Sequence, residues 1–325
     1  MISRLITGAV KEHGMLLLSE TWKTTLILIK IIVPVSIAAK ILNDFGITEY
    51  IGLALGPVMR SVGLPGSMGL VWATAMVTNL YAAMIVFASL APAEHLTIAQ
   101  VTVLATMMLL AHSLPVELNI AKKAGTRISF MFLLRVSGAF FTGLLLDRIY
   151  RLSGSLQAGH ILLWTPDMSD PSWLAWAIDQ FIALLSISGI IFSLLLIVKI
   201  LTLLRIIDLL KKTFEPILRI MGMSRDAAPI TIIGMTMGIG YGGGLIIREA
   251  RSGTLSGKDI FFSLSFMGLM HSMIEDTLLM LLMGGHISGV LVFRFIFAMS
   301  AIFLMVRVIR HVSDRTFNRF FSGVP

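Results

Sequence analysis

The sequence contains no cysteine among its 325 residues. This absence excludes disulfide bonds, thiolate metal sites and catalysis by a cysteine nucleophile. Charged residues are also scarce, at 14% of the chain, whereas soluble domains average about 25%. Several signatures of enzymes are missing too, among them His-Glu-x-x-His, Gly-x-Ser-x-Gly and a phosphate-binding glycine-rich loop. We therefore expect neither an enzyme nor an ATP- or GTP-driven machine, and no cofactor.

Hydrophobic residues make up 56% of the chain, in runs of about 20 residues or more, each long enough to cross a hydrocarbon core of ~30 Å as a helix. The sequence therefore predicts an all-α integral membrane protein. The formal net charge of +8 is better explained by basic cytoplasmic loops than by nucleic-acid binding. The predicted partners are the lipid bilayer and a small polar solute or divalent cation, and no nucleic acid. A homodimer is one option for the oligomeric state.

The second half of the chain repeats features of the first at one fixed offset. His112 and His271 are 159 residues apart, and the same offset relates Arg135 to Arg294, Pro57 to Pro216 and Gly63 to Gly222. Matches of these residue types predict a tandem repeat of about 150 residues. The predicted divisions are an amphipathic segment at 1–20, repeat 1 at 21–151, an extracytoplasmic connector at 152–179, repeat 2 at 180–310 and a basic cytoplasmic tail at 311–325.

Loop charge predicts that the two repeats are inverted. The basic loop at 122–127 has an uncharged equivalent at 284–287, and the loop at 92–95, which is not basic, has a basic equivalent at 248–258. Basic loops face the cytoplasm, so equivalent loops face opposite sides. Both termini are then cytoplasmic, in a multi-pass protein of the inner (cytoplasmic) membrane.

Inversion needs an odd number of membrane crossings in each repeat. Each repeat has four apolar segments, so one of them should not cross. The interrupted segments 67–91 and 229–247 are the natural exceptions, and we expect them to be re-entrant broken hairpins. Each repeat then has three spans, one such hairpin and one amphipathic helix. The expected spans lie near 21–45, 96–120, 127–149, 180–204, 259–283 and 287–310, and the amphipathic helices near 48–63 and 206–223.

Polar residues inside these apolar segments are the candidate solute-binding residues, because ionisable groups in a membrane face the protein interior or a water-filled cavity. Ser113 and Glu117 have i, i+4 spacing, as do Ser272 and Asp276, so each pair can share a helix face. The alternative is a buried network that only fixes the packing of the two halves. The candidates are His112, Ser113, Glu117, Asn119, His271, Ser272, Glu275, Asp276, Asn79, Tyr81, Tyr241 and Gly242.

Three basic residues lie inside predicted spans. Arg135 and Arg294 either neutralise the carboxylates or bind an anionic solute, and the first is favoured because buried charges are normally paired. Lys30 is either a coupling group or the partner of a carboxylate. At the hairpin breaks, the glycines around Tyr241 either let a solute approach backbone amides or allow close helix packing.

In the two His-Ser segments, such as Ala111-His112-Ser113-Leu114-Pro115-Val116-Glu117, and in the glycine-broken hairpin, the chain resembles the Gate domain family. This family includes concentrative nucleoside transporters, the membrane part of the ferrous-iron transporter and spore-maturation membrane proteins. The resemblance covers about 25–150 and 183–310, which is typical of two Gate domains in one chain. It implies membrane transport and hairpins that contribute to a solute site, but not one substrate. The chain lacks the GTPase and the cysteines of the iron transporter.

Three functions remain open. The first is a transporter or facilitator of a small polar, nucleoside-like solute with a site between the repeats. The second is a permease for a divalent cation such as Fe²⁺ or Mn²⁺, although the two arginines argue against a cation-only cavity. The third is a membrane scaffold that transports nothing. The metal ligands under the second hypothesis would be His112, Glu117, His271 and Glu275.

Overall fold

The computed structural model describes residues 44–161, 172–204 and 206–323, with scattered positions between residues 19 and 42. The amphipathic segment predicted at 1–20, much of the first predicted span and the middle of the connector lie outside the described residues. The described residues form helices joined by short loops, with no β-strand among them. The all-α prediction is therefore confirmed.

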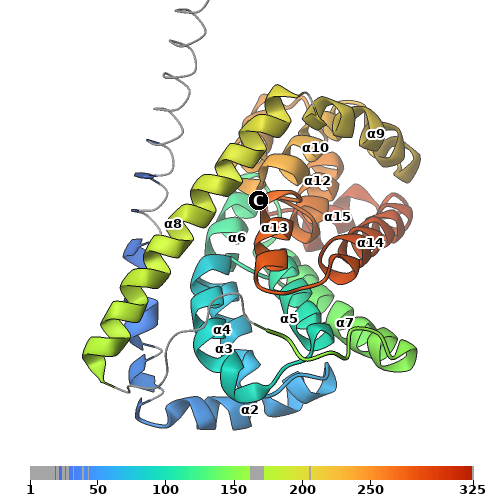
Figure 1. Cartoon of the computed structure of the whole chain (residues 1–325). Helices are drawn as coiled ribbons and strands as arrows, with labels where there is room; N and C mark the ends of the chain where they lie inside the picture. Colours follow the sequence, from blue (N-terminus) through green and yellow to red (C-terminus); the bar gives the residue numbers. More distant parts are fainter. Residues whose placement is uncertain are drawn as a thin grey trace, which may run out of the picture.

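Figure 1 shows the helices in chain order. The first half contains α2 (Ile47–Ser61), α3 (Met68–Val77), α4 (Leu80–Glu94), α5 (Ile98–Leu110), α6 (Leu114–Lys123) and α7 (Ile128–Ser153). The second half contains α8 (Trp173–Leu203), α9 (Ile206–Met221), α10 (Ala227–Met237), α11 (Ile239–Ser252), α12 (Gly257–Leu269), α13 (Glu275–Leu282), the π-helix η1 (Ser288–Phe293), α14 (Arg294–Ile309) and α15 (Asp314–Phe320).

Four helical segments of the described chain are long and apolar enough to cross a membrane: Ile98–Lys123, Ile128–Ser153, Trp173–Leu194 and Ser288–Ile309. The first of these is divided into α5 and α6 by a break at residues 111–113. The third of these begins at Trp173 rather than near residue 180, so the end of the predicted connector is helical. The span predicted at 259–283 is instead two shorter helices, α12 and α13, because residues 270–274 leave the helix. The segments 67–91 and 229–247 are also divided, into α3 with α4 and α10 with α11.

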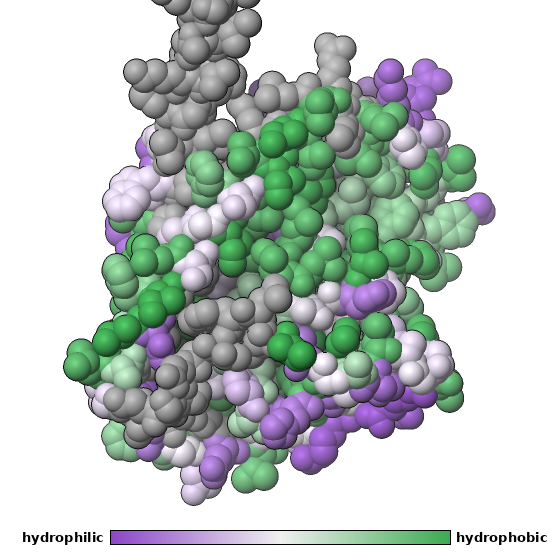
Figure 2. Space-filling model, viewed as in Figure 1, coloured by the Kyte–Doolittle hydropathy of each residue, from purple (hydrophilic) through white to green (hydrophobic). Residues whose placement is uncertain are grey.

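The outer helices present apolar side chains to their surroundings. On α8, Leu174, Phe181 and Leu185 are each more than half exposed, and Leu133 and Phe141 of α7 are similarly exposed. Figure 2 shows this hydrophobic surface along α8, with hydrophilic residues gathered at the bottom and the upper right of the view. Apolar surface of this extent is what lipid tails cover, which agrees with a membrane protein.

The core is built around α5 and α12. Both helices are apolar on nearly every face, and almost all of their residues are buried, as expected for helices surrounded by protein. Helix α5 packs against α7, α13 and η1, while α12 packs against α7, α10 and α14. The two halves of the chain therefore interlock through their most buried helices.

The amphipathic helices were correctly predicted, as α2 and α9, and they lie at opposite ends of the molecule (Figure 1). Helix α2 ends in a turn at Gly63, whose φ is 76°. A Cβ atom there would lie 1.9 Å from Oδ1 of the buried Asp147. Gly154 ends α7 with a similar φ of 66°, but nothing lies within 4 Å of its Cβ position.

These two glycines allow a matched test. Gly154→Ala should lower the free energy of unfolding by about 1–2 kcal/mol, the cost of a left-handed alanine. Gly63→Ala should lower it by about 2–5 kcal/mol, because overpacking against Asp147 adds about 1–3 kcal/mol. Unfolding of the detergent-purified protein by added SDS measures both values. Equal losses in the two variants would contradict the close packing at Gly63.

Candidate functional site

Two breaks in the central helices create the candidate site. The first separates α5 from α6 at residues 111–113, and the second separates α12 from α13 at residues 270–274. Ser113 and Ser272 adopt the left-handed conformation there, with φ of 48° and 45°, which is uncommon for residues other than glycine. The chain therefore turns sharply within two segments that the sequence predicted as continuous spans.

Ser113 and Ser272 lie just before α6 and α13, and their carbonyl oxygens accept hydrogen bonds from the N–H groups of Glu117 at 3.1 Å and Asp276 at 2.9 Å. Backbone hydrogen bonds also tie each break to a neighbouring helix. The Ser113 N–H donates to the Ala75 carbonyl of α3 at 2.9 Å, and the Met273 N–H donates to the Met235 carbonyl of α10 at 2.8 Å. The breaks are thus held against the ends of the other divided helices.

Arg135 of α7 and Arg294 of α14 satisfy the carbonyl groups that the breaks leave free. Both guanidinium groups are almost wholly buried, at 1% and 0% exposure. Each donates from Nε to the last carbonyl of the preceding helix and from Nη2 to the carbonyl of the histidine at the break. These acceptors are the carbonyl oxygens of Leu110 and His112 at 2.9 and 3.0 Å, and of Leu269 and His271 at 3.1 and 3.1 Å.

The two histidines meet at the centre. Their Nε2 atoms are 3.1 Å apart, and their ring centroids are 4.8 Å apart. The other ring nitrogen of each histidine contacts a backbone carbonyl: Nδ1 of His112 lies 3.0 Å from the Met108 oxygen, and Nδ1 of His271 lies 2.7 Å from the Met267 oxygen. A carbonyl oxygen only accepts hydrogen bonds, so Nδ1 carries a proton in both rings.

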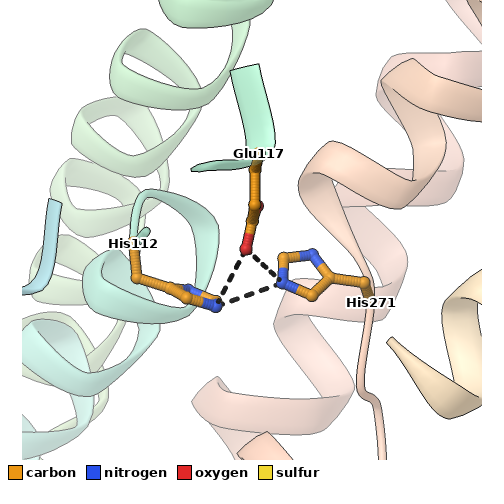
Figure 3. A group of neighbouring side chains, drawn as sticks. All are labelled: His112, Glu117 and His271. Atoms are coloured by element: carbon orange, nitrogen blue, oxygen red, sulfur yellow. Dashed lines mark hydrogen bonds and ion pairs between the residues drawn. The ribbon is translucent and has the colours of Figure 1, made fainter. Parts of the chain in front are cut away.

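Glu117 completes the group shown in Figure 3, where the three side chains point toward one another. Its Oε1 lies 3.2 Å from Nε2 of His271 and 3.6 Å from Nε2 of His112. Its Oε2 accepts a hydrogen bond from Nη1 of Arg135. One carboxylate oxygen is therefore held by the guanidinium group, while the other faces both imidazoles.

The second half supplies a carboxylate that is arranged differently. Oδ2 of Asp276 lies 3.8 and 3.9 Å from the Nε2 atoms of His112 and His271. Within the described chain this buried oxygen has no hydrogen-bond partner, and neither does Nη1 of Arg294. The described residues include no ion pair between Asp276 and Arg294, unlike the contact of Glu117 with Arg135.

Three other predicted site residues, Glu275, Tyr81 and Asn79, form hydrogen bonds outside this group. Glu275 is partly buried, and its Oε1 accepts a hydrogen bond from the Tyr81 hydroxyl of α4 at 3.0 Å. It is not among the side chains whose ligand atoms cluster, contrary to the metal hypothesis. Asn79 caps α4, because its Oδ1 accepts from the Ala82 N–H at 2.9 Å.

The remaining predicted residues lie apart from the group or outside the description. Asn119 and Lys30 are exposed. Tyr241 and Gly242 belong to α11, but their side chains lie outside the described part of the chain. Sequence reasoning also missed the carbonyl acceptors that fix the histidines and the arginines. The only signal for them was Pro115, which lies in the first turn of α6 just after the break.

The fold and the site define an all-α membrane protein in which two broken helices meet at a buried group of ionisable side chains. Residues 25–127 match the Gate family model, which is described as nucleoside recognition. The chain is also 24% identical, over 281 residues, to the uncharacterized membrane protein YvoD of Bacillus subtilis (strain 168), covering 85% of this chain and 88% of that protein. No solved structure matches.

The two arginines provide a test of the site geometry. Arg135→Met and Arg294→Met each remove the donors to two carbonyls, which should lower the free energy of unfolding by about 1–3 kcal/mol for each carbonyl. Arg135→Met should lower it by about 3–5 kcal/mol more, because Glu117 is left buried without its charged partner. SDS unfolding of both detergent-purified variants measures the difference. A loss for Arg294→Met as large as that for Arg135→Met would contradict the asymmetry.

Proposed function

We propose that this protein transports a small polar solute across a membrane and that the His112–His271 group is its solute site. The observation that carries the proposal is a buried group of ionisable side chains at two helix breaks. Ionisable residues inside a membrane are costly and mark solute or ion pathways by default. Broken backbone at that depth is tolerated only where protein buries it or where it lines a cavity.

We also propose that the two halves are inverted repeats. In support, α2 begins at Ile47 and α9 at Ile206, the same 159-residue separation as between His112 and His271. The two amphipathic helices lie at opposite ends of the molecule (Figure 1). Arg135 and Arg294 make corresponding hydrogen bonds to the two breaks. Inverted repeats with broken helices at their interface are a common design of transporters with alternating access.

The proposed topology has three spans per repeat, with α3–α4 and α10–α11 as re-entrant hairpins. The first hairpin consists of helices of 10 and 15 residues, which reach about 15 and 22 Å at 1.5 Å per residue and so fall short of a ~30 Å core. Both termini are then cytoplasmic, in the inner membrane. The protein acts as a transporter rather than an enzyme, and a homodimer is compatible with this arrangement.

Two classes of solute fit different observations. The description of the matching family favours a nucleoside-like solute. The geometry favours a divalent cation, because the ligand atoms of His112, Glu117 and His271 all lie within 4.8 Å of one another. That spacing suits one ion, whereas organic ligands of drug size occupy pockets of about 300–1,000 Å³.

Neutralising the carboxylates separates a transporter from a scaffold. Glu117→Gln and Asp276→Asn should abolish solute uptake into proteoliposomes, because the charges that face the solute are lost. Asp276→Asn should still fold, since its Oδ2 has no hydrogen bond to lose. Uptake of labelled nucleosides and of Mn²⁺ measures the effect, and size-exclusion chromatography and thermal melting report the fold.

Glu215→Gln is the matched control, because Glu215 lies on α9 in an exposed ion pair with Arg219, away from the site. This variant should transport as the wild type does. If no solute enters with wild-type protein, and Glu117→Gln and Asp276→Asn only melt at lower temperature, the side chains form a structural network and the protein is a scaffold.

A further inference from the structure

In each histidine of the pair, the backbone hydrogen bond uses Nδ1 and leaves Nε2 facing the other side chains. Because both Nδ1 atoms donate to backbone carbonyls, the Nε2 atoms of neutral His112 and His271 carry lone pairs. These atoms are 3.1 Å apart, and Oε1 of Glu117, also an acceptor, faces both of them. With both rings neutral, three acceptors converge with no proton between them, and a cation at the centre would contact all three.

We infer that Nε2 of His112, Nε2 of His271 and Oε1 of Glu117 bind a divalent transition-metal cation. The distances fit this ligand set. Ligands at about 2.0–2.1 Å from a tetrahedral ion are about 3.3–3.4 Å apart. The three ligand atoms are separated by 3.1, 3.2 and 3.6 Å. Imidazole and carboxylate ligands without thiolate suit ions such as Fe²⁺, Mn²⁺, Co²⁺ and Zn²⁺.

Asp276 lies just outside this cluster of three side chains and is the candidate for a fourth ligand. Its Oδ2 is buried, has no hydrogen-bond partner within the described chain, and lies 3.8 and 3.9 Å from the two Nε2 atoms. These separations exceed the tetrahedral value by about 0.5 Å, so a small movement of α13 completes the coordination. A buried carboxylate oxygen without a donor is costly unless a cation contacts it.

The surroundings orient these ligands in the way metal sites require. Metal-binding histidines commonly donate their other N–H to a backbone carbonyl, which fixes the ring and its tautomer. Met108 and Met267 provide those carbonyls, and Arg135 holds Oε2 of Glu117 so that Oε1 turns toward the histidines. The ionisable groups that face the site are the carboxyl groups of Glu117, Glu275 and Asp276 and the guanidinium groups of Arg135 and Arg294.

Equilibrium binding of Co²⁺ to the full-length protein, purified in detergent without a histidine tag, tests the site. Binding of the ion is measured without transport. Only the step in which the bound ion is transported rests on the proposed function. We expect about one Co²⁺ per chain, with the strong visible absorption of a four-coordinate ion. Changes to the residues that support metal ligands weaken binding roughly 10–100-fold. His271→Gln removes a ligand itself and should therefore weaken Co²⁺ binding by more than that. His311→Gln, at an exposed position after α14, should bind as the wild type does.

A measurement on the wild type covers the case in which His271→Gln does not fold. X-ray absorption of the Co²⁺-loaded protein should show scattering from imidazole ligands at about 2.0–2.1 Å. Absence of stoichiometric Co²⁺ binding, binding that His271→Gln leaves unchanged, or a spectrum without imidazole would each overturn the inference. A proton shared between the two Nε2 atoms would then account for their contact.

Uptake of Co²⁺ into proteoliposomes separates this inference from the proposed function. Stoichiometric binding together with uptake supports both, and makes the ion the transported solute. Binding without uptake of any solute supports the metal site and contradicts transport. Nucleoside uptake by a protein that binds no Co²⁺ supports transport and overturns the metal site.

Discussion

The helix breaks at residues 111–113 and 270–274 are the constraint on which the rest of the site depends. A helix that ends in a low-dielectric interior leaves carbonyl groups that need donors. Arg135 and Arg294 supply those donors by reaching in from α7 and α14. A buried guanidinium group in turn calls for a carboxylate, and that requirement accounts for Glu117 beside Arg135. The polar side chains at the centre thus follow from the carbonyl groups that the helix breaks leave without donors.

The two halves meet this requirement unequally, and their carboxylate side chains differ in length by one methylene group. Glu117 and Asp276 stand at corresponding positions, since the two residues are 159 apart. The longer glutamate reaches Arg135 with one oxygen and the histidines with the other. The shorter aspartate is in no ion pair with Arg294, and its Oδ2 stays without a hydrogen bond in the described chain. A site with two-fold character thereby keeps one carboxylate oxygen that is free to bind a ligand.

The helices were largely predictable, whereas the geometry of the site was not. Apolar runs and loop charge predicted an all-α membrane protein, and the amphipathic helices ended up within two residues of their expected bounds. The span at 259–283 was predicted as continuous because residues 270–274 are mostly apolar, and hydrophobicity does not reveal a break whose polar groups are satisfied by a distant arginine. The contact of His112 with His271 depends on how the halves pack, which a single sequence does not contain.

The burial of the site bears on how a transported ion would reach it. His112, Glu117 and His271 are at most 5% exposed, so an ion enters only when packed elements separate. The hydrogen bond from Tyr81 of α4 to Glu275 of α13 joins the two halves beside the site, within reach of Asp276. Separating α4 from α13 breaks this bond and frees the carboxylate of Glu275 next to the ligands. In the proposed transporter, Glu275 would therefore both join the two halves and supply a carboxylate next to the ligands.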